Sequence, residues 1–225
     1  MASDVALTWQ PSLFDAGEPA VDGTFASIRR ERLDSRSWVE VAPAWVRGAD
    51  ELFDALLEAV GWRQRNRWMY DQRVDEPRLT SSWKDADGVP IHPAIEAMRT
   101  ALSTHYGVAF VSGGLNLYRD GRDSVAWHGD RIPEELTEPI VGIVSLGHAR
   151  SFRLRPRGGG PSREFRMQRG DLLVTGGRCQ REWEHSIPKV ANAGPRLSIT
   201  FRHTDPAPPP RSADDEAPFT PPDRG

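Results

Sequence analysis

Two histidines and one aspartate have the types and the order needed to hold a metal ion. His128 and Asp130 are two residues apart, so on an extended segment both side chains leave the same face and can reach one ion. His185 follows about fifty-five residues later, and only a closed fold brings it to the pair. Two imidazoles and one carboxylate with open positions form the facial triad of non-haem Fe(II) oxygenases. The sequence therefore predicts an iron site whose three ligands are also its catalytic residues.

Each part of this signal also has an ordinary explanation. The pattern His-x-Asp arises by chance in a chain of this composition. A lone histidine among aromatic residues, as in Trp183-Glu184-His185, is more often a hydrogen-bonded core residue. The metal prediction therefore depends on what else the chain offers to the same cavity.

An alternating segment bounded by two arginines offers a surface for an acidic co-substrate. Alternation over residues 196–202 sends the apolar side chains into the core and the polar ones to the opposite face, namely Arg196, Ser198, Thr200 and Arg202. Guanidinium groups suit a dicarboxylate such as 2-oxoglutarate. Since the two arginine Cα atoms would be about 20 Å apart on a strand, we expect one arginine on the distal carboxylate and the other near the metal-binding end or a metal ligand. An exposed amphipathic strand is the alternative interpretation.

Two polar residues of an earlier strand extend the same cavity. Asn116 and Tyr118 share a face and would offer an amide and a phenol to the co-substrate. Their alternative role is hydrogen bonding within the core. No nucleophile triad, P-loop or dinucleotide-binding fingerprint appears in the sequence.

Periodicity predicts two helices followed by short strands. A helix capped by Asp50 is expected to end at Gly61, and a second helix over 93–105 to stop at Gly107. The pattern then changes to β-like runs separated by turn residues, at 109–117, 140–146, 151–155, 164–167, 171–175 and 197–202. This order favours an α+β, mainly β fold: a double-stranded β-helix, or jelly roll, with supporting helices on one side.

Length and composition favour one domain with two tails. Of the 225 residues 38% are hydrophobic, which is enough for a core, and we expect an extended arm at 1–38 and the catalytic domain at 39–205. The last segment, 206–225, has seven prolines and few apolar side chains, which predicts disorder. No apolar run reaches the length of a membrane span and the single cysteine fits a reducing compartment, so we expect a cytoplasmic monomer.

Positive charge is concentrated although the net charge is −3. Between His148 and Arg169 seven arginines stand against one acid, Glu164. Such a field could bind a phosphate-bearing partner. The alternative is a solvated hairpin whose charges protect an edge strand from aggregation.

Six segments occur in one order over about residues 76 to 203: EPRLTSSW, LNLYRDGRDSVAWHGD, PIVGIVSLGHARSFRLR, GDLLVTGG, WEHSIPK and PRLSITFR. Together they resemble the AlkB family of Fe(II)/2-oxoglutarate-dependent nucleic-acid demethylases, most of all the subgroup that repairs alkylated bases. The resemblance implies a jelly roll in which His128, Asp130 and His185 hold Fe(II). It also implies that Arg196 pairs with the distal carboxylate of 2-oxoglutarate, helped by Asn116 and Tyr118, with Arg202 near the metal-proximal end.

The resemblance also implies a nucleic-acid partner. A methyl group on a base-pairing nitrogen is inaccessible in a duplex, so the enzyme must take single strands or flip the base. Residues about 61–89 suit a nucleotide-recognition lid, because cations and aromatics alternate there. We expect lid or pocket residues at Trp68, Met69, Tyr70 and Trp83, with His128 also flanking the base. The alternative for each aromatic is packing against the helix layer.

One departure from the family pattern concerns base preference. Repair members commonly carry an acid two positions after the metal-binding aspartate, where this chain has Ile132. Arg131, a further candidate for substrate binding, also replaces a frequent acid, and Glu134 could compensate from the loop. An apolar side chain cannot accept a hydrogen bond from an exocyclic amine or meet a cationic methylated base.

The leading hypothesis is therefore an Fe(II)/2-oxoglutarate dioxygenase acting with O2 on 1-methyladenine- or 3-methylcytosine-type lesions in DNA or RNA. Its products would be repaired base, formaldehyde, succinate and CO2. Two alternatives are the same chemistry on a modified tRNA base or a protein, and a nucleic-acid binding module without turnover. The complete set of His128, Asp130, His185, Arg196 and Arg202 argues against the last of these.

Overall fold

Two antiparallel sheets face each other in the computed structural model, which describes Leu7 and residues 17–69, 72–84 and 91–204. The predicted tail at 206–225 and Tyr70 lie outside the described residues. The large sheet has the strand order β2 (Arg29–Arg32), β3 (Ser37–Ala42), β12 (Leu172–Gly177), β9 (Val141–Gly147), β14 (Arg196–His203), β7 (Phe110–Tyr118), β6 (Gln72–Lys84) and β5 (Arg63–Met69). The small sheet has the order β11 (Arg163–Met167), β10 (Arg150–Pro156), β13 (Trp183–Ile187) and β8 (Val125–His128). This is the predicted jelly roll.

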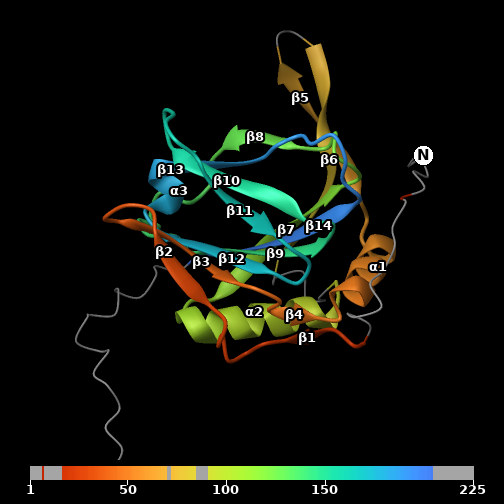
Figure 1. Ribbon diagram of the computed structural model, residues 1–225, viewed down its shortest axis with the longest axis horizontal. Helices are drawn as coiled ribbons and strands as arrows, with labels where there is room; N and C mark the ends of the chain where they lie inside the picture. The colour runs from red at the N-terminus through yellow and green to blue at the C-terminus, as the bar shows by residue number, and fades with distance from the viewer. Residues whose placement is uncertain (1–6, 8–16, 70–71, 85–90, 205–225) are drawn as a thin grey trace, which may run out of the picture.

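In the part of the chain that the structure describes, two helices cover the outer face of the large sheet (Figure 1). They are α1 (Ala49–Ala59) and α2 (Pro93–Tyr106), while α3 (Cys179–Glu182) is a single turn before β13. Alternation along β14 divides its side chains between two environments, as predicted. Leu197, Ile199 and Phe201 join the core under the helices, and the polar residues between them face the small sheet. A second apolar cluster lies between the two sheets and includes Val39, Phe152 and Leu154.

The two predicted helices form, but the cap expected for the first is wrong. Gly48 is the N-cap of α1, with a φ of 63° in the left-handed region that glycine tolerates. Asp50 lies inside the first turn and pairs with Arg169 at 2.6 Å. In α2 the side chain of His92 accepts a hydrogen bond from the amide of Ala94, and the left-handed Gly107 ends the helix.

The segment expected to be an extended arm contributes strands to the large sheet. Residues 29–32 and 37–42 form β2 and β3, and β3 pairs with β12 along six residues. Before them, β1 (Ala20–Val21) pairs with β4 (Val46–Arg47), and Phe25 is buried against Trp45. The β2 residues are all exposed, so the sequence there had no apolar alternation to predict a strand.

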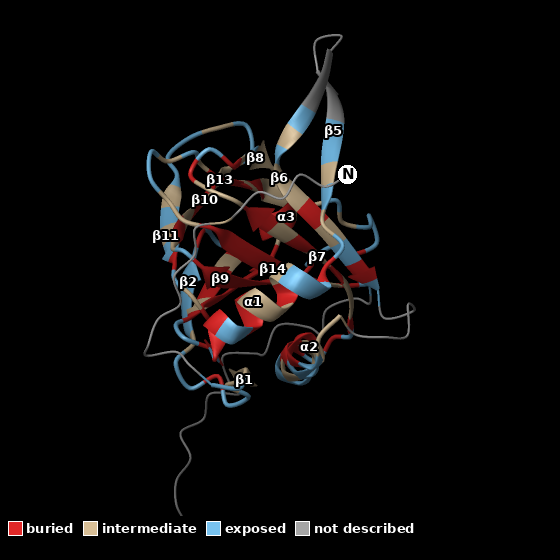
Figure 2. Cartoon of the chain, turned by 90° about the vertical axis from the view of Figure 1, so that its right-hand side faces the viewer, coloured by how far each residue is buried: buried red, intermediate tan, exposed pale blue. Residues whose placement is uncertain are grey.

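Strands β5 and β6 form a hairpin at the end of the large sheet that projects beyond the other strands (Figures 1 and 2). The base of the hairpin is anchored, because β6 pairs with β7 from Leu79 to Lys84. Its described outer part carries exposed side chains such as Arg65, Asn66 and Asp75. The predicted lid at about 61–89 includes this hairpin.

The arginine-rich segment forms the β10–β11 hairpin at the edge of the small sheet. Three of its arginines pair with acids: Arg153 with Glu164, Arg155 with Glu184 and Arg163 with Glu31. Arg150 is 2% exposed and belongs to the interior rather than to a surface patch. The ion pairs favour the interpretation of a charged protective hairpin over a phosphate-binding patch.

Within the residues that the structure describes, no helix has the length and apolar character needed to cross a bilayer.

Candidate active site

The three predicted metal ligands meet in one place. His128 ends β8 and stands directly opposite His185 of β13, so antiparallel pairing of the two strands brings the imidazoles together. Their ring centroids are 4.3 Å apart. Asp130 follows β8 after one glycine, and the potential ligand atoms of the three residues all lie within 4.8 Å of one another. Two imidazoles and a carboxylate at this spacing fit the facial triad of an Fe(II) site.

Neighbouring groups orient both imidazoles. Nδ1 of His128 lies 2.9 Å from the carbonyl oxygen of Ala126, so Nδ1–H donates to it and Nε2 keeps the lone pair that a metal needs. The ring of His185 is stacked on Phe152 at 5.1 Å. Burial lowers the pKa of His185 to about 4, against the opposite effect of Asp130. The imidazole is therefore neutral at neutral pH, which is the form that coordinates a metal.

The second arginine of β14 binds a metal ligand. Nη2 and Nε of Arg202 donate to Oδ2 of Asp130 at 3.0 and 3.2 Å. Burial alone raises the pKa of the Asp130 carboxyl. The Arg202 guanidinium, and after it His185, lower this pKa by more, so the pKa lies below its usual range. The carboxylate is therefore charged and positioned, and its other oxygen is left for a metal.

Residues adjacent to the ligands stabilise the small sheet from its other face. Trp127 and Glu184 precede His128 and His185 and point to the opposite side, as alternation requires. Arg155 of β10 binds both: its Nε donates to Glu184 at 2.6 Å, and its guanidinium lies 4.2 Å from the Trp127 ring centroid. One arginine thus connects the two ligand-bearing strands.

The first arginine of β14 is a buried cation with a free donor. Arg196 is 1% exposed, and its Nε donates to Ser145 at 2.9 Å. Its guanidinium lies 5.2 Å from the ring centroid of Tyr118, and Nη1 has no hydrogen-bond partner. Burial lowers the pKa of Arg196, yet an arginine stays charged in proteins. A buried cation with an unsatisfied donor fits a carboxylate ligand, which is what the distal end of 2-oxoglutarate supplies.

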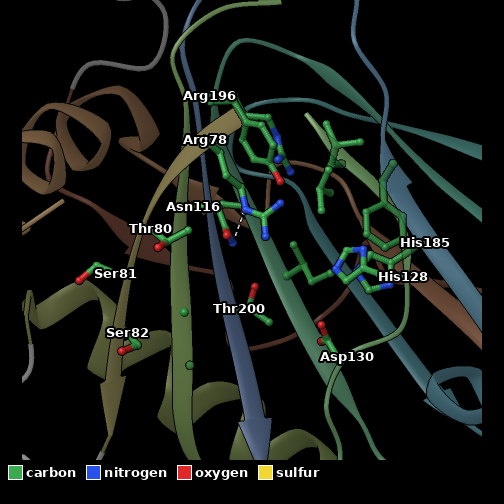
Figure 3. A pocket seen from close by; sticks show the side chains of 18 of the residues that line it. Arg78, Thr80, Ser81, Ser82, Asn116, His128, Asp130, His185, Arg196 and Thr200 are labelled. Carbon is green, nitrogen blue, oxygen red and sulfur yellow. Dashed lines mark hydrogen bonds between the residues drawn. The ribbon is translucent and has the colours of Figure 1, made fainter. Parts of the chain in front are cut away.

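One cavity of about 230 Å³ connects this cation to the metal ligands. Figure 3 shows Arg196, Arg78 and Asn116 on one side of the space and His128, His185 and Asp130 on the other. Asn116 donates to Ser198 at 3.4 Å, between the two ends. The walls near the triad are apolar, formed by Val125, Ile143, Phe152 and Ile187. A five-carbon diacid thus has a metal site for one end and a guanidinium for the other.

Arg78 is a cavity residue that the sequence did not predict. Arg78 projects from β6, and its side chain is 16% exposed. Its Nη2 lies 3.3 Å from Oε2 of Glu76, and its buried Nε has no hydrogen-bond partner. Arg65 lines the same cavity from β5. The available signal was the polar character of this segment, in which Arg78, Thr80, Ser81 and Ser82 all line the cavity.

The predicted substrate residues have different positions. Trp83 is 9% exposed and packs in the core at 5.6 Å from Phe201, so the packing alternative holds and the prediction of a lid role is wrong. Trp68 and Met69 belong to β5 of the projecting hairpin. Arg131 is exposed, while Ile132 packs against the cluster between the sheets and does not line the cavity.

Comparison with known proteins identifies the family. A model described as the 2OG-Fe(II) oxygenase superfamily matches residues 41–202. A human protein named DNA oxidative demethylase ALKBH2 is 32% identical over 198 residues, covering 78% of this chain and 75% of that protein. The chain belongs to the AlkB family of 2-oxoglutarate- and Fe(II)-dependent oxygenases. The predicted family and cofactors are thereby confirmed.

Other AlkB relatives agree in sequence and in fold. The human alpha-ketoglutarate-dependent dioxygenase alkB homolog 3 is 30% identical, and the match covers 72% of this chain and 64% of that protein. The bovine alkB homolog 3 is also 30% identical, with 71% of this chain and 63% of that protein covered. The chain thus matches less than two thirds of the length of these two relatives. The solved structure of OsALKBH1 is 12% identical with a TM-score of 0.57, covering 78% of this chain and 100% of that one, and shares the fold.

Proposed function

We propose that this AlkB-family protein is a dioxygenase that removes alkyl groups from base-pairing nitrogens of DNA or RNA bases, the class that includes 1-methyladenine and 3-methylcytosine. The observation that carries the proposal is the single cavity that joins the His128–Asp130–His185 cluster to the free guanidinium donor of Arg196. The name of the human relative, DNA oxidative demethylase, supports a base as the substrate.

The reaction consumes one O2 and one 2-oxoglutarate for each alkyl group. Fe(II) and 2-oxoglutarate together supply the oxidation, in which one oxygen atom enters the methyl group and the other enters succinate as CO2 is released. The hydroxymethyl group then leaves as formaldehyde when its C–N bond breaks, and the nitrogen takes the hydroxyl proton. The role of the protein is to bind, orient and exclude water.

Each of these roles has a residue in the cavity. Arg196 binds the distal carboxylate, since its Nη1 is buried and has no other acceptor. Arg202 keeps Asp130 charged and turned toward the two imidazoles. Phe152 and Ile143 give the cavity an apolar wall, which keeps water from that side and strengthens the charge interactions inside the cavity.

The projecting hairpin supports a nucleic acid as the partner. Arg65 of β5 and Arg78 of β6 place positive charge beside the cavity, which favours the approach of a polyanionic nucleic acid. The described part of the hairpin projects beyond the other strands of the two sheets (Figure 2) and can lie along a strand of nucleic acid. A base turned out of its stack would then enter the cavity.

The test measures succinate formed from 2-oxoglutarate by the iron-loaded protein. Single-stranded oligonucleotides with and without a methylated base, a modified tRNA and a peptide mixture are compared, with Asp130→Ala as the control lacking a metal ligand. We expect the methylated oligonucleotide to stimulate succinate formation and the unmodified one to have little effect. Stimulation by the tRNA or the peptides alone would assign the oxygenase to another substrate, and wild-type activity in the Asp130→Ala variant would contradict the metal site.

A further inference from the structure

Positive charge predominates among the described side chains that line the cavity. Among the residues that the structure describes, those lining the cavity include four arginines and a single carboxylate, namely Arg65, Arg78, Arg196, Arg202 and Asp130. The carboxylate is already bound by Arg202. A ligand that enters therefore finds donors and positive charge rather than acceptors and negative charge.

The metal and the co-substrate leave this excess in place. Asp130 and the two carboxylates of 2-oxoglutarate would carry three negative charges, against four positive charges on Arg196, Arg202 and a divalent metal. Glu76 lies 3.3 Å from Arg78 and offsets its charge in part. The one positive charge that remains and the charge of Arg65 have no matching acid among the described residues of the cavity wall. The loaded site thus stays positive.

The acids that adjoin the ligands in sequence are turned away from the cavity. Glu184 points to the outer face and binds Arg155 at 2.6 Å. In the loop after Asp130, Arg131 and Glu134 are exposed, and Ile132 packs between the sheets. None of these side chains belongs to the cavity lining. The loop therefore offers no carboxylate to a base in the cavity.

Alkylated bases fall into two charge classes. Methylation at N3 of cytosine or N1 of adenine gives a base that is protonated, and so cationic, at neutral pH. Methylation at N3 of uracil or N1 of guanine replaces the proton of a neutral base and leaves it neutral. A cation that enters a positive, partly buried site without a counter-charge is repelled and loses its hydration.

We propose that this site selects neutral N-alkylated bases over cationic ones. The inference rests on the proposed function and narrows its substrate class. Arg65, an exposed arginine of the cavity lining that has no acidic partner among the described residues, is the residue most directly responsible for the selection. Its guanidinium also donates only, so it suits the carbonyl oxygens that uracil and guanine present beside the methylated nitrogen.

Matched oligonucleotides test charge separately from shape. One single-stranded sequence carries either 3-methylcytosine or 3-methyluracil, which differ at one exocyclic group, and a second carries either 1-methyladenine or 1-methylguanine. Formaldehyde release gives kcat/KM for each. Affinity is measured separately without turnover, using Mn(II) and the inert co-substrate analogue N-oxalylglycine. We expect the neutral member of each pair to be favoured at least about tenfold in kcat/KM, as one uncompensated charge in a partly buried site would cause, and to bind more tightly.

Reversing the charge of Arg65 tests whether this residue causes the preference for neutral bases. Arg65→Glu should reduce the preference for the neutral member or invert it, whereas Arg166→Glu, the same change at an exposed position on β11, should leave the ratio as in the wild type. Demethylation with equal rates, or with the cationic member favoured, would overturn this inference and leave the proposed function standing. Absence of formaldehyde from all four oligonucleotides would overturn the proposed function and this inference with it.

Discussion

Nε and Nη2 of Arg202 both donate to one oxygen of Asp130, Oδ2, at 3.2 and 3.0 Å. This pair joins strand β14 to the loop that follows β8, and it leaves Oδ1 of the carboxylate for a metal. The other arginine of the strand, Arg196, lies beside Tyr118 and Ser145. The two arginines of one strand therefore have separate tasks, one for the metal side of the cavity and one for the co-substrate side.

Arg202→Ala should weaken metal binding. The substitution removes both hydrogen bonds that orient Asp130, and loss of such an outer partner typically lowers metal affinity about 10- to 100-fold. Titration of the metal-free protein with Mn(II), followed by calorimetry, measures the effect directly. Unchanged affinity in Arg202→Ala would show that Asp130 keeps its position without the arginine.

Arg196→Ala should act on the co-substrate instead. Loss of a charge-assisted hydrogen bond of about 1.5–3 kcal/mol raises the KM for 2-oxoglutarate roughly 10- to 100-fold, while Mn(II) affinity stays near that of the wild type. Steady-state kinetics with varied 2-oxoglutarate gives the first value and the same titration gives the second. If Arg196→Ala lost metal affinity and kept its KM, the assignment of the two arginines would be reversed.

Gly113→Ala should destabilise the fold, and Gly114→Ala should not. A Cβ at Gly113 would collide with the carbonyl oxygen of Thr200 and the indole of Trp83, whereas at Gly114 it would meet its nearest atoms at 3.7 and 3.9 Å. Overpacking of this kind costs about 2–3 kcal/mol. Urea unfolding of the two variants compares them, and equal stability would mean that Trp83 can move without penalty.

Arg150 connects the two loops that continue the ligand-bearing strands. Its guanidinium donates to the carbonyl oxygens of Asp120, Asp123 and Pro188, at 3.1, 2.9 and 2.7 Å. The first two precede β8, and Pro188 follows β13. Loss of one buried arginine thus leaves three acceptors without their donor.

Arg150→Met should therefore lower stability by about 3 kcal/mol, because buried carbonyl groups lose their partners. That corresponds to a fall of roughly 6–12 °C in melting temperature for a domain of this size. Arg122→Met, on the same loop but with its side chain 90% exposed, is the control and should melt as the wild type does. Calorimetry that found the two variants alike would refute the role given to Arg150.

The single thiol should be unreactive in the folded protein. Cys179 is 1% exposed, and burial raises its pKa to about 12, so almost no thiolate forms at pH 8. An aromatic disulfide reagent should react with the thiol only after denaturant is added. Rapid reaction of the native protein at pH 8 would show that α3 opens.

What the sequence predicted and what it missed depended on the range of each signal. The triad and the β14 alternation were visible because residue type and local spacing carry them. The strand β2, with four exposed polar residues, and the polar strand β6 are defined by pairing with distant strands, which no local pattern reports. Likewise the strand order of the large sheet brings Ser145 to Arg196 and Arg78 to the cavity. Trp83 was misplaced because aromatic residues serve cores and stacking surfaces alike.

The most direct test of base dealkylation follows three products in one reaction. Iron-loaded protein is given 2-oxoglutarate, O2 and single-stranded oligonucleotides carrying 3-methyluracil or 3-methylcytosine, and formaldehyde, succinate and the restored base are quantified together. We expect formaldehyde and restored base in equal amounts, matched by succinate, and none of the three from the Asp130→Ala variant. Succinate without restored base in either oligonucleotide would contradict it.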